Sequence, residues 1–143
     1  MHNFILNKRP VSYNSCRGTK KTNYKNAVQR SFTVYNSMPA ILGGDLYAII
    51  YYFYNKNLKL DTDNLSKPVL DSLTGFLFSD DQQVKIRIAG SFDLTNGDYS
   101  VIDMSGLDGR LAVDLLDAFD KEDHIVYVEC GKFNPAMLKF NIE

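Results

Sequence analysis

The feature that most constrains the fold is the run Asp45–Tyr54 (DLYAIIYYFY), which is β-branched, aromatic and almost continuously apolar. A strand with apolar residues at consecutive positions buries both of its faces, as strands in the middle of a sheet do. We therefore expect a central strand here, with other elements covering both sides. The chain has 143 residues, which is enough for one domain with a sizeable core and too few for two ordinary ones.

Shorter patterns predict the other elements. Apolar periodicity and turn residues favour four further strands: His2–Asn7, 84–88, 99–102 after an Asn96–Gly97 hairpin turn, and 125–128. In the second of these, Val84, Ile86 and Ile88 alternate with Lys85 and Arg87. Helices are expected at 21–35, at 64–74 capped by Gly75, and at 107–119, where Leu111, Leu115, Leu116 and Phe119 form the apolar face. Strands and helices mix without strict alternation. The predicted fold class is therefore α+β, a mixed α/β sheet packed with helices, in a single domain over residues 1–143.

The formal net charge of −1 hides a strong asymmetry along the chain. Up to Gly44 there are seven basic residues and no acid, whereas residues 61–123 hold fourteen acids and five basic residues. Clustered basic residues favour phosphate binding, because each neutralised phosphate releases counterions. The alternative for the basic residues is a solvated surface, and for Lys85 and Arg87 it is an edge strand protected by charge. The candidates for contacting nucleic acid are Lys20, Lys21, Lys25, Arg30, Lys85 and Arg87.

Cys16 and Cys130 lack the spacing of a metal site, so we expect free thiols in a reducing cytoplasm. No apolar run is long enough to cross a membrane, and residues 1–10 lack the apolar core of a signal peptide. A cytoplasmic protein that does not engage a membrane is the expectation.

The most informative stretch is rich in carboxylates: DTDNLSKPVLDSLTGFLFSDDQQV, from Asp61 to Val84. Asp61 and Asp63 stand two apart at the start of a predicted helix, and a second acidic pair, Asp80 and Asp81, comes where the chain turns toward the next strand. Together they would supply hard oxygen ligands, which suit Mg²⁺ or Mn²⁺. An EF-hand calcium loop is excluded, because Ser66 and Ser72 stand where Gly and Glu are required.

Lys67 lies one helical turn from both Asp63 and Asp71. It could sit beside a metal site and stabilise charge that develops on a phosphate. The alternative reading is purely structural: Asp63 is a helix N-cap, and Lys67 and Asp71 form a surface ion pair. Spacing leaves both readings open. Pro68 is unusual in this helix, so the helix is expected either to start after Asn64 or to bend at the proline.

The pattern DxDNLxKxxxDxLxGxxxxDDxQV resembles the signature of RusA-type Holliday junction resolvases, small metal-dependent endonucleases common in prophages. A weaker similarity lies in Pro10–Asn14. The matching positions in the main motif are Asp61, Asp63, Asn64, Leu65, Lys67, Asp71, Leu73, Gly75, Asp80, Asp81, Gln83 and Val84.

The resemblance implies a small α/β domain that forms a homodimer, binds four-way DNA junctions and nicks two strands symmetrically. It implies that Asp61, Asp63 and Asp81 coordinate Mg²⁺, with Mn²⁺ as a substitute, and that Lys67 is the essential lysine. Asp71 and Asp80 would be supporting acids. The acidic segment near 103–124 looks like an addition to the family pattern.

The leading hypothesis is thus a divalent-metal-dependent endodeoxyribonuclease that resolves Holliday junctions by paired phosphodiester hydrolysis. A second hypothesis is a non-catalytic DNA-binding or dimerisation module that kept the fold, which Pro68 and the pI of about 6.1 motivate. A third is a nuclease of the same chemistry that acts on another branched DNA or on RNA.

Overall fold

The computed structural model describes residues 1–38, 40–56, 62–95 and 102–141. Its elements, in chain order, are β1 (His2–Leu6), η1 (Tyr13–Ser15), α1 (Gly18–Tyr35), β2 (Leu46–Tyr54), α2 (Thr62–Leu73), η2 (Asp81–Gln83), β3 (Val84–Asp93), α3 (Gly109–Lys121), β4 (His124–Lys132) and η4 (Pro135–Met137). None of the described helices is long and apolar enough to span a bilayer.

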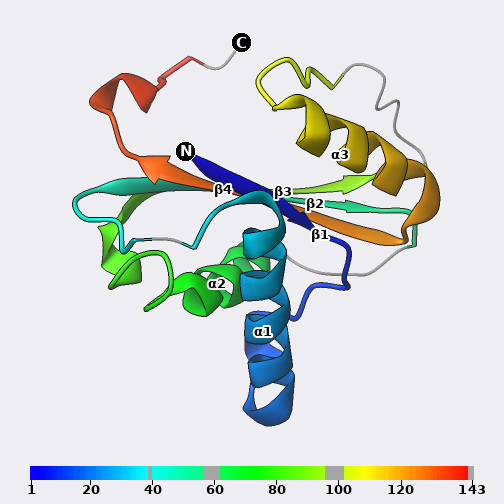
Figure 1. Ribbon diagram of the computed structural model, residues 1–143, viewed down its shortest axis with the longest axis horizontal. Coiled ribbons are helices and arrows are strands. Elements are labelled where there is room, and N and C mark those ends of the chain that lie inside the picture. Colours follow the sequence, from blue (N-terminus) through cyan, green and yellow to red (C-terminus); the bar gives the residue numbers. More distant parts are fainter. Residues whose placement is uncertain (39, 57–61, 96–101, 142–143) are drawn as a thin grey trace.

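The four strands form one mixed sheet in the order β1-β4-β2-β3 (Figure 1). β4 runs antiparallel to both β1 and β2, while β3 runs parallel to β2. Three helices pack on this sheet, which confirms the predicted α+β class. The run Asp45–Tyr54 does provide an interior strand, because β2 lies between β4 and β3.

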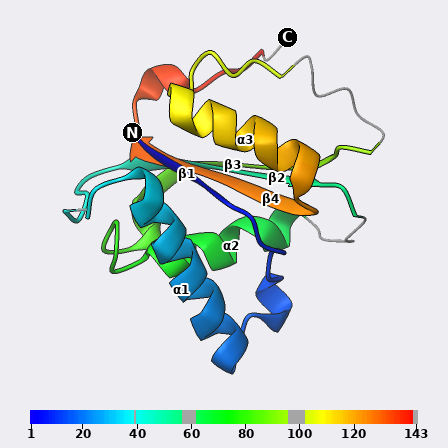
Figure 2. The ribbon, with the colours of Figure 1, turned by 45° about the vertical axis from the view of Figure 1, so that its right-hand side comes forward.

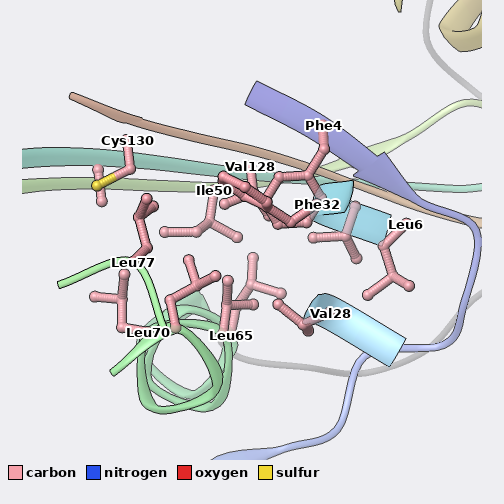
Figure 3. Packing of buried hydrophobic residues seen from close by; sticks show 14 of the residues in the cluster. Phe4, Leu6, Val28, Phe32, Ile50, Leu65, Leu70, Leu77, Val128 and Cys130 are labelled. Carbon is pink, nitrogen blue, oxygen red and sulfur yellow. The ribbon is translucent and has the colours of Figure 1, made fainter. Parts of the chain in front are cut away.

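β2 buries its two faces against different partners. Ala48, Ile50 and Tyr52 point to one side and are fully buried. There they meet α1 and α2 in the larger apolar cluster, which Figure 3 shows with Val28 and Leu70 facing Ile50 across the core. This alternation explains why the sequence of β2 is apolar at every position: each side of the strand has its own core.

α3 covers the opposite face of the sheet, as Figure 2 shows. Leu111, Leu115 and Phe119 are buried there, and the Phe119 ring lies 4.9 Å from the ring of Phe53 on β2. The helix predicted at 107–119 therefore exists, shifted by two residues. The assignment of Leu116 to its apolar face is wrong, because that side chain is 50% exposed. Leu111, Leu115 and Phe119 repeat every four residues, and Leu116 falls off that stripe.

α2 begins at Thr62 and continues through Pro68 to Leu73. Of the two alternatives expected because of Pro68, a start after Asn64 is therefore wrong. Pro68 cannot donate a backbone hydrogen bond, so the helix forgoes one bond in its second turn. One turn later, the Ser72 Oγ donates to the carbonyl of Pro68 at 2.7 Å. Gly75 follows with φ +79°, a left-handed conformation that suits glycine at a helix C-terminus, as predicted.

β3 forms as predicted, but its pattern of burial differs from the expected half-buried strand. Ile88 is 44% exposed, because β3 lies at the end of the sheet and, within the described ranges, pairs only with β2. The predicted turn at Asn96–Gly97 lies outside the described residues, as does all of the predicted return strand except Ile102. Ile102 belongs to no strand. The predictions for β1, α1 and β4 are confirmed, with α1 beginning three residues early, at Gly18.

Candidate functional site

α2 presents a polar row on the side away from the core. Asp63, Lys67 and Asp71 are spaced four residues apart, while Leu65, Val69 and Leu73 on the other side are buried. Residues four apart on a helix are neighbours on one face. Asp63 lies in the first turn, one residue inside the helix, so the alternative reading of Asp63 as the helix N-cap is wrong.

A turn after α2 returns the chain to this polar row. Gly75 allows the chain to reverse, and the segment 76–80 leads into η2, whose first residue is Asp81. The Asp80 carboxylate caps η2 by accepting a hydrogen bond from the backbone N–H of Gln82 at 2.9 Å. Asp81 is thereby placed at a defined point beside α2, although it lies fourteen residues along the chain from Lys67.

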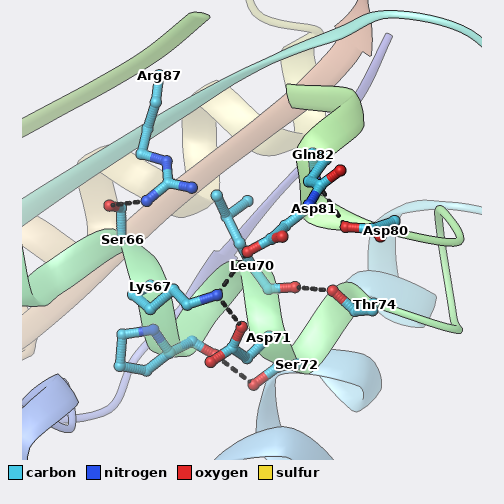
Figure 4. Close-up of polar contacts among 11 residues, drawn as sticks. Ser66, Lys67, Leu70, Asp71, Ser72, Thr74, Asp80, Asp81, Gln82 and Arg87 are labelled. Atoms are coloured by element: carbon cyan, nitrogen blue, oxygen red, sulfur yellow. Dashed lines mark hydrogen bonds and ion pairs between the residues drawn. The ribbon is translucent and has the colours of Figure 1, made fainter. Parts of the chain in front are cut away.

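Lys67 is held between two carboxylates (Figure 4). Its Nζ donates to Asp71 Oδ1 at 2.8 Å and to Asp81 Oδ2 at 2.5 Å. The side chains are only partly exposed, at 34%, 32% and 25% for Lys67, Asp71 and Asp81. The first of these pairs follows from helical spacing, and the second requires the tertiary fold. Two carboxylates from different elements, Asp71 on α2 and Asp81 on η2, thus converge on one cation.

These contacts shift the pKa values of the paired groups. Hydrogen bonds, first to Asp71 and then to Asp81, raise the pKa of Lys67, and the hydrogen bond from Lys67 is the main cause that lowers the pKa of Asp81. The lowered carboxyl pKa stabilises the fold above the ordinary value for aspartate, and this stabilisation is lost as the pH falls through the folded-state pKa. The raised lysine pKa stabilises the fold below the ordinary lysine value and is lost as the pH rises through the raised one. The ion pairs therefore persist throughout the neutral range.

A second cation stands near this group. Arg87 on β3 donates from Nη1 to the buried Ser66 Oγ at 3.3 Å, and its charge also lowers the pKa of Asp81. The Arg87 side chain is exposed. Asp81 thus faces one positive group from α2 and another from β3.

The structure brings together only part of the predicted metal site. Asp61 lies outside the described residues, and among those that are described no group of three or more histidine, cysteine, aspartate or glutamate side chains is close enough to hold a metal ion. Asp63 lies one turn before Lys67 on the same face of α2. The two described members of the predicted set, Asp63 on α2 and Asp81 on η2, offer carboxylate oxygens, the donors that hard divalent cations prefer.

The candidate residues for DNA contact are all exposed and lie on two elements. α1 carries Lys20, Lys21, Lys25 and Arg30, and its N-terminal end projects away from the sheet (Figure 1). β3 carries Lys85 and Arg87. Lys85 also lines an open depression of about 490 Å³ next to the turn that holds Asp80.

Gln83 also contributes to the site region, and it was not among the site residues predicted from the sequence. Gln83 forms a capping box with Asp80, and its side chain also reaches the loop before β2. The spacing of an N-cap aspartate and a glutamine three residues later could have predicted the capping box. Nothing in the sequence could have predicted the contact with the loop.

A mixed four-stranded sheet covered by helices, with a lysine held between two acids at one side, defines a small α+β protein. Comparison with known families makes this specific. The family model described as Endodeoxyribonuclease RusA matches residues 14–97, which is more than half of the chain. The protein belongs to the RusA endodeoxyribonuclease family, whose members resolve Holliday junctions. The match includes α1, β2, α2 and the acidic stretch 61–84, and it ends before α3. No curated protein matches the chain.

Proposed function

We propose that the protein is a divalent-metal-dependent endodeoxyribonuclease that resolves four-way DNA junctions by hydrolysing two phosphodiesters, as a homodimer. The observation that carries the proposal is Lys67 held between Asp71 and Asp81, within the part of the chain that the family model matches. Resolution requires one nick in each of two strands. A pair of identical sites in a symmetric dimer would supply both nicks.

In this proposal Asp61, Asp63 and Asp81 hold Mg²⁺, with Mn²⁺ as a substitute. A bound ion of this kind supplies a water of lowered pKa and a Lewis acid for the phosphoryl oxygen. The two described acids lie on different elements, Asp63 on α2 and Asp81 on η2. The relative placement of α2 and η2 therefore determines whether the donors can act together.

Lys67 would stabilise negative charge on the phosphate as it develops in the transition state. Its raised pKa keeps the ammonium protonated at neutral pH, so it acts as a fixed positive charge rather than as a base. Asp71 would orient this ammonium from the next helical turn, through the 2.8 Å ion pair. A preoriented charge needs no reorganisation when the reaction occurs, and this is the source of its catalytic value.

Basic residues on two elements would bind the DNA backbone. We assign Lys20, Lys21, Lys25 and Arg30 on α1, and Lys85 and Arg87 on β3, to phosphate contacts. Arg87 supports the assignment most directly, because it is exposed and lies near Asp81. These contacts would let a chain with a pI of about 6.1 bind DNA, since four of the six basic groups lie on α1, in the stretch up to Gly44 that contains no acid.

The segment 103–124 would be an addition to the family domain that serves packing. Its helix, α3, buries Leu111, Leu115 and Phe119 against the sheet on the face opposite α1 and α2. We also place the protein in the cytoplasm, where its two free thiols, Cys16 and Cys130, would remain reduced.

The proposal is tested by incubating the protein with an end-labelled synthetic four-way junction. In Mg²⁺ or Mn²⁺ we expect symmetric nicks in two opposing strands. Addition of EDTA should abolish this nicking, because the carboxylates alone cannot activate water. A linear duplex of the same sequence, a flapped duplex and an RNA hairpin serve as comparison substrates. Failure to nick the junction at any metal or salt concentration would contradict the proposed activity, and preferential cutting of the flap or the RNA would contradict the proposed substrate.

A further inference from the structure

Gln83 uses the whole hydrogen-bonding capacity of its side-chain amide. Its Oε1 accepts from the backbone N–H groups of Ser79 and Asp80, at 3.0 and 3.1 Å. Its Nε2 donates to the carbonyl oxygens of Leu42 and Gly44, both at 3.0 Å. A primary amide offers two acceptor sites and two N–H donors, so all four are engaged. The opposite orientation of the amide would set its NH₂ group against two N–H donors, so the network itself fixes which way the amide points.

These four bonds join two segments that are distant in the sequence. One is the loop 41–44, which leads into β2, and the other is the turn 79–80, which leads into Asp81. A backbone hydrogen bond from Leu42 N–H to the Leu77 carbonyl, at 2.8 Å, supports the same junction. Gly44 has φ +75°, so the loop adopts a backbone conformation that a side chain would strain.

Hydrogen bonds of this network hold the residues immediately before and after Asp81 in the chain. Asp80, immediately before it, is held by Gln83 Oε1, and Gln82, immediately after it, is held by the Asp80 carboxylate. The backbone of Asp81 therefore has little freedom to shift. Its carboxylate, on the other side, reaches Lys67 on α2.

We propose that Gln83 is a positioning residue for the reaction: by clamping the loop 41–44 to the turn 79–80, its amide fixes where the Asp81 carboxylate stands relative to α2. Gln83 does not touch the substrate in this account. The inference rests on the proposed function for its catalytic consequence, and on the four hydrogen bonds for the clamp itself. Groups that orient a metal-ligating carboxylate typically contribute about 10- to 100-fold to metal affinity or activity.

The test compares Gln83→Met, which keeps the length of the side chain and removes all four bonds, with Gln82→Met as the matched control. Gln82 is exposed, and its contact with the cap is made by its backbone N–H, which the substitution leaves in place. We expect Gln83→Met to lower kcat and the Mn²⁺ affinity measured by calorimetry by about 10- to 100-fold. KM and junction affinity should change less than about twofold, because the basic residues remain. Amide hydrogen exchange at Ser79 and Asp80 should become faster. Gln82→Met should leave all five quantities unchanged.

A second variant keeps the test decisive if Gln83→Met folds poorly. Gln83→Glu retains the acceptor bonds from Ser79 and Asp80 and loses the donor bonds to the loop, so we expect a smaller loss of Mn²⁺ affinity. The inference is overturned if Gln83→Met, folded by circular dichroism, binds Mn²⁺ and turns over as the unmodified protein does. If the unmodified protein does not cut junctions, the proposed function fails by itself. The clamp is then judged on Mn²⁺ affinity and amide exchange, and unchanged values in Gln83→Met overturn it.

Discussion

Replacing Asp81 by Asn is expected to lower the rate of junction nicking by about 10³-fold, which corresponds to about 4 kcal/mol of transition-state stabilisation. The amide keeps the shape of the side chain but removes the charge that a divalent cation requires. It also removes the ion pair to Lys67 across α2 and η2. Single-turnover cleavage in Mg²⁺ and calorimetric titration with Mn²⁺ measure the two consequences separately.

Junction binding by Asp81→Asn should be unchanged or tighter, because a negative charge near the phosphate path is lost. The matched control is Asp117→Asn, the same change of charge on the exposed side of α3, on the opposite face of the sheet. Asp117→Asn should cut normally. An Asp81→Asn protein that nicks junctions at the normal rate would remove Asp81 from the site.

Replacing Lys67 by Met is expected to lower the nicking rate by about 10²- to 10³-fold, the usual effect of removing one preorganised group that stabilises developing charge. Met keeps most of the apolar stem of the side chain, so the packing of α2 is preserved. Lys67→Arg should recover only part of the rate, because the planar guanidinium cannot place a compact charge between Asp71 and Asp81 at the distances seen for the ammonium.

The two variants differ in their effect on metal binding, which separates a ligand from a charge stabiliser. Lys67→Met leaves Asp71 and Asp81 without their shared cation, so the affinity for Mn²⁺ should be retained or increased. The affinity of Asp81→Asn should fall. If Lys67→Met bound Mn²⁺ normally and also cut at the normal rate, the ion pairs of Lys67 would be structural only, which is the alternative that the sequence left open.

The elements of the fold were largely predictable, because they depend on local patterns. The interior position of β2 follows from its continuous apolar run, and the buried stripe of Tyr24, Val28 and Phe32 on α1 follows from helical periodicity. Two details were not predictable, because they depend on tertiary structure and not on a local pattern. Pro68 argues against a helix locally, yet tertiary burial of α2 outweighs the lost hydrogen bond. Ile88 alternates as a buried residue would, but its exposure depends on the position of β3 at the edge of the sheet.

The site was predictable in its residue types and only partly in its geometry. The Lys67–Asp71 pair follows from a spacing of four on a helix. The approach of Asp81 to Lys67 depends on the turn after Gly75, and no local pattern specifies where that turn ends. The same holds for Gln83, whose contact with Leu42 spans forty-one residues.

We propose that Asp61, Asp63 and Asp81 form a metal site beside Lys67. The most direct measurement is a crystal structure of the protein soaked in Mn²⁺, with anomalous scattering recorded at the manganese absorption edge. This metal site predicts a manganese ion coordinated by the carboxylates of Asp81, Asp63 and Asp61, with Lys67 adjacent. A saturating soak that leaves these carboxylates without a peak, or places manganese only elsewhere on the chain, would contradict it.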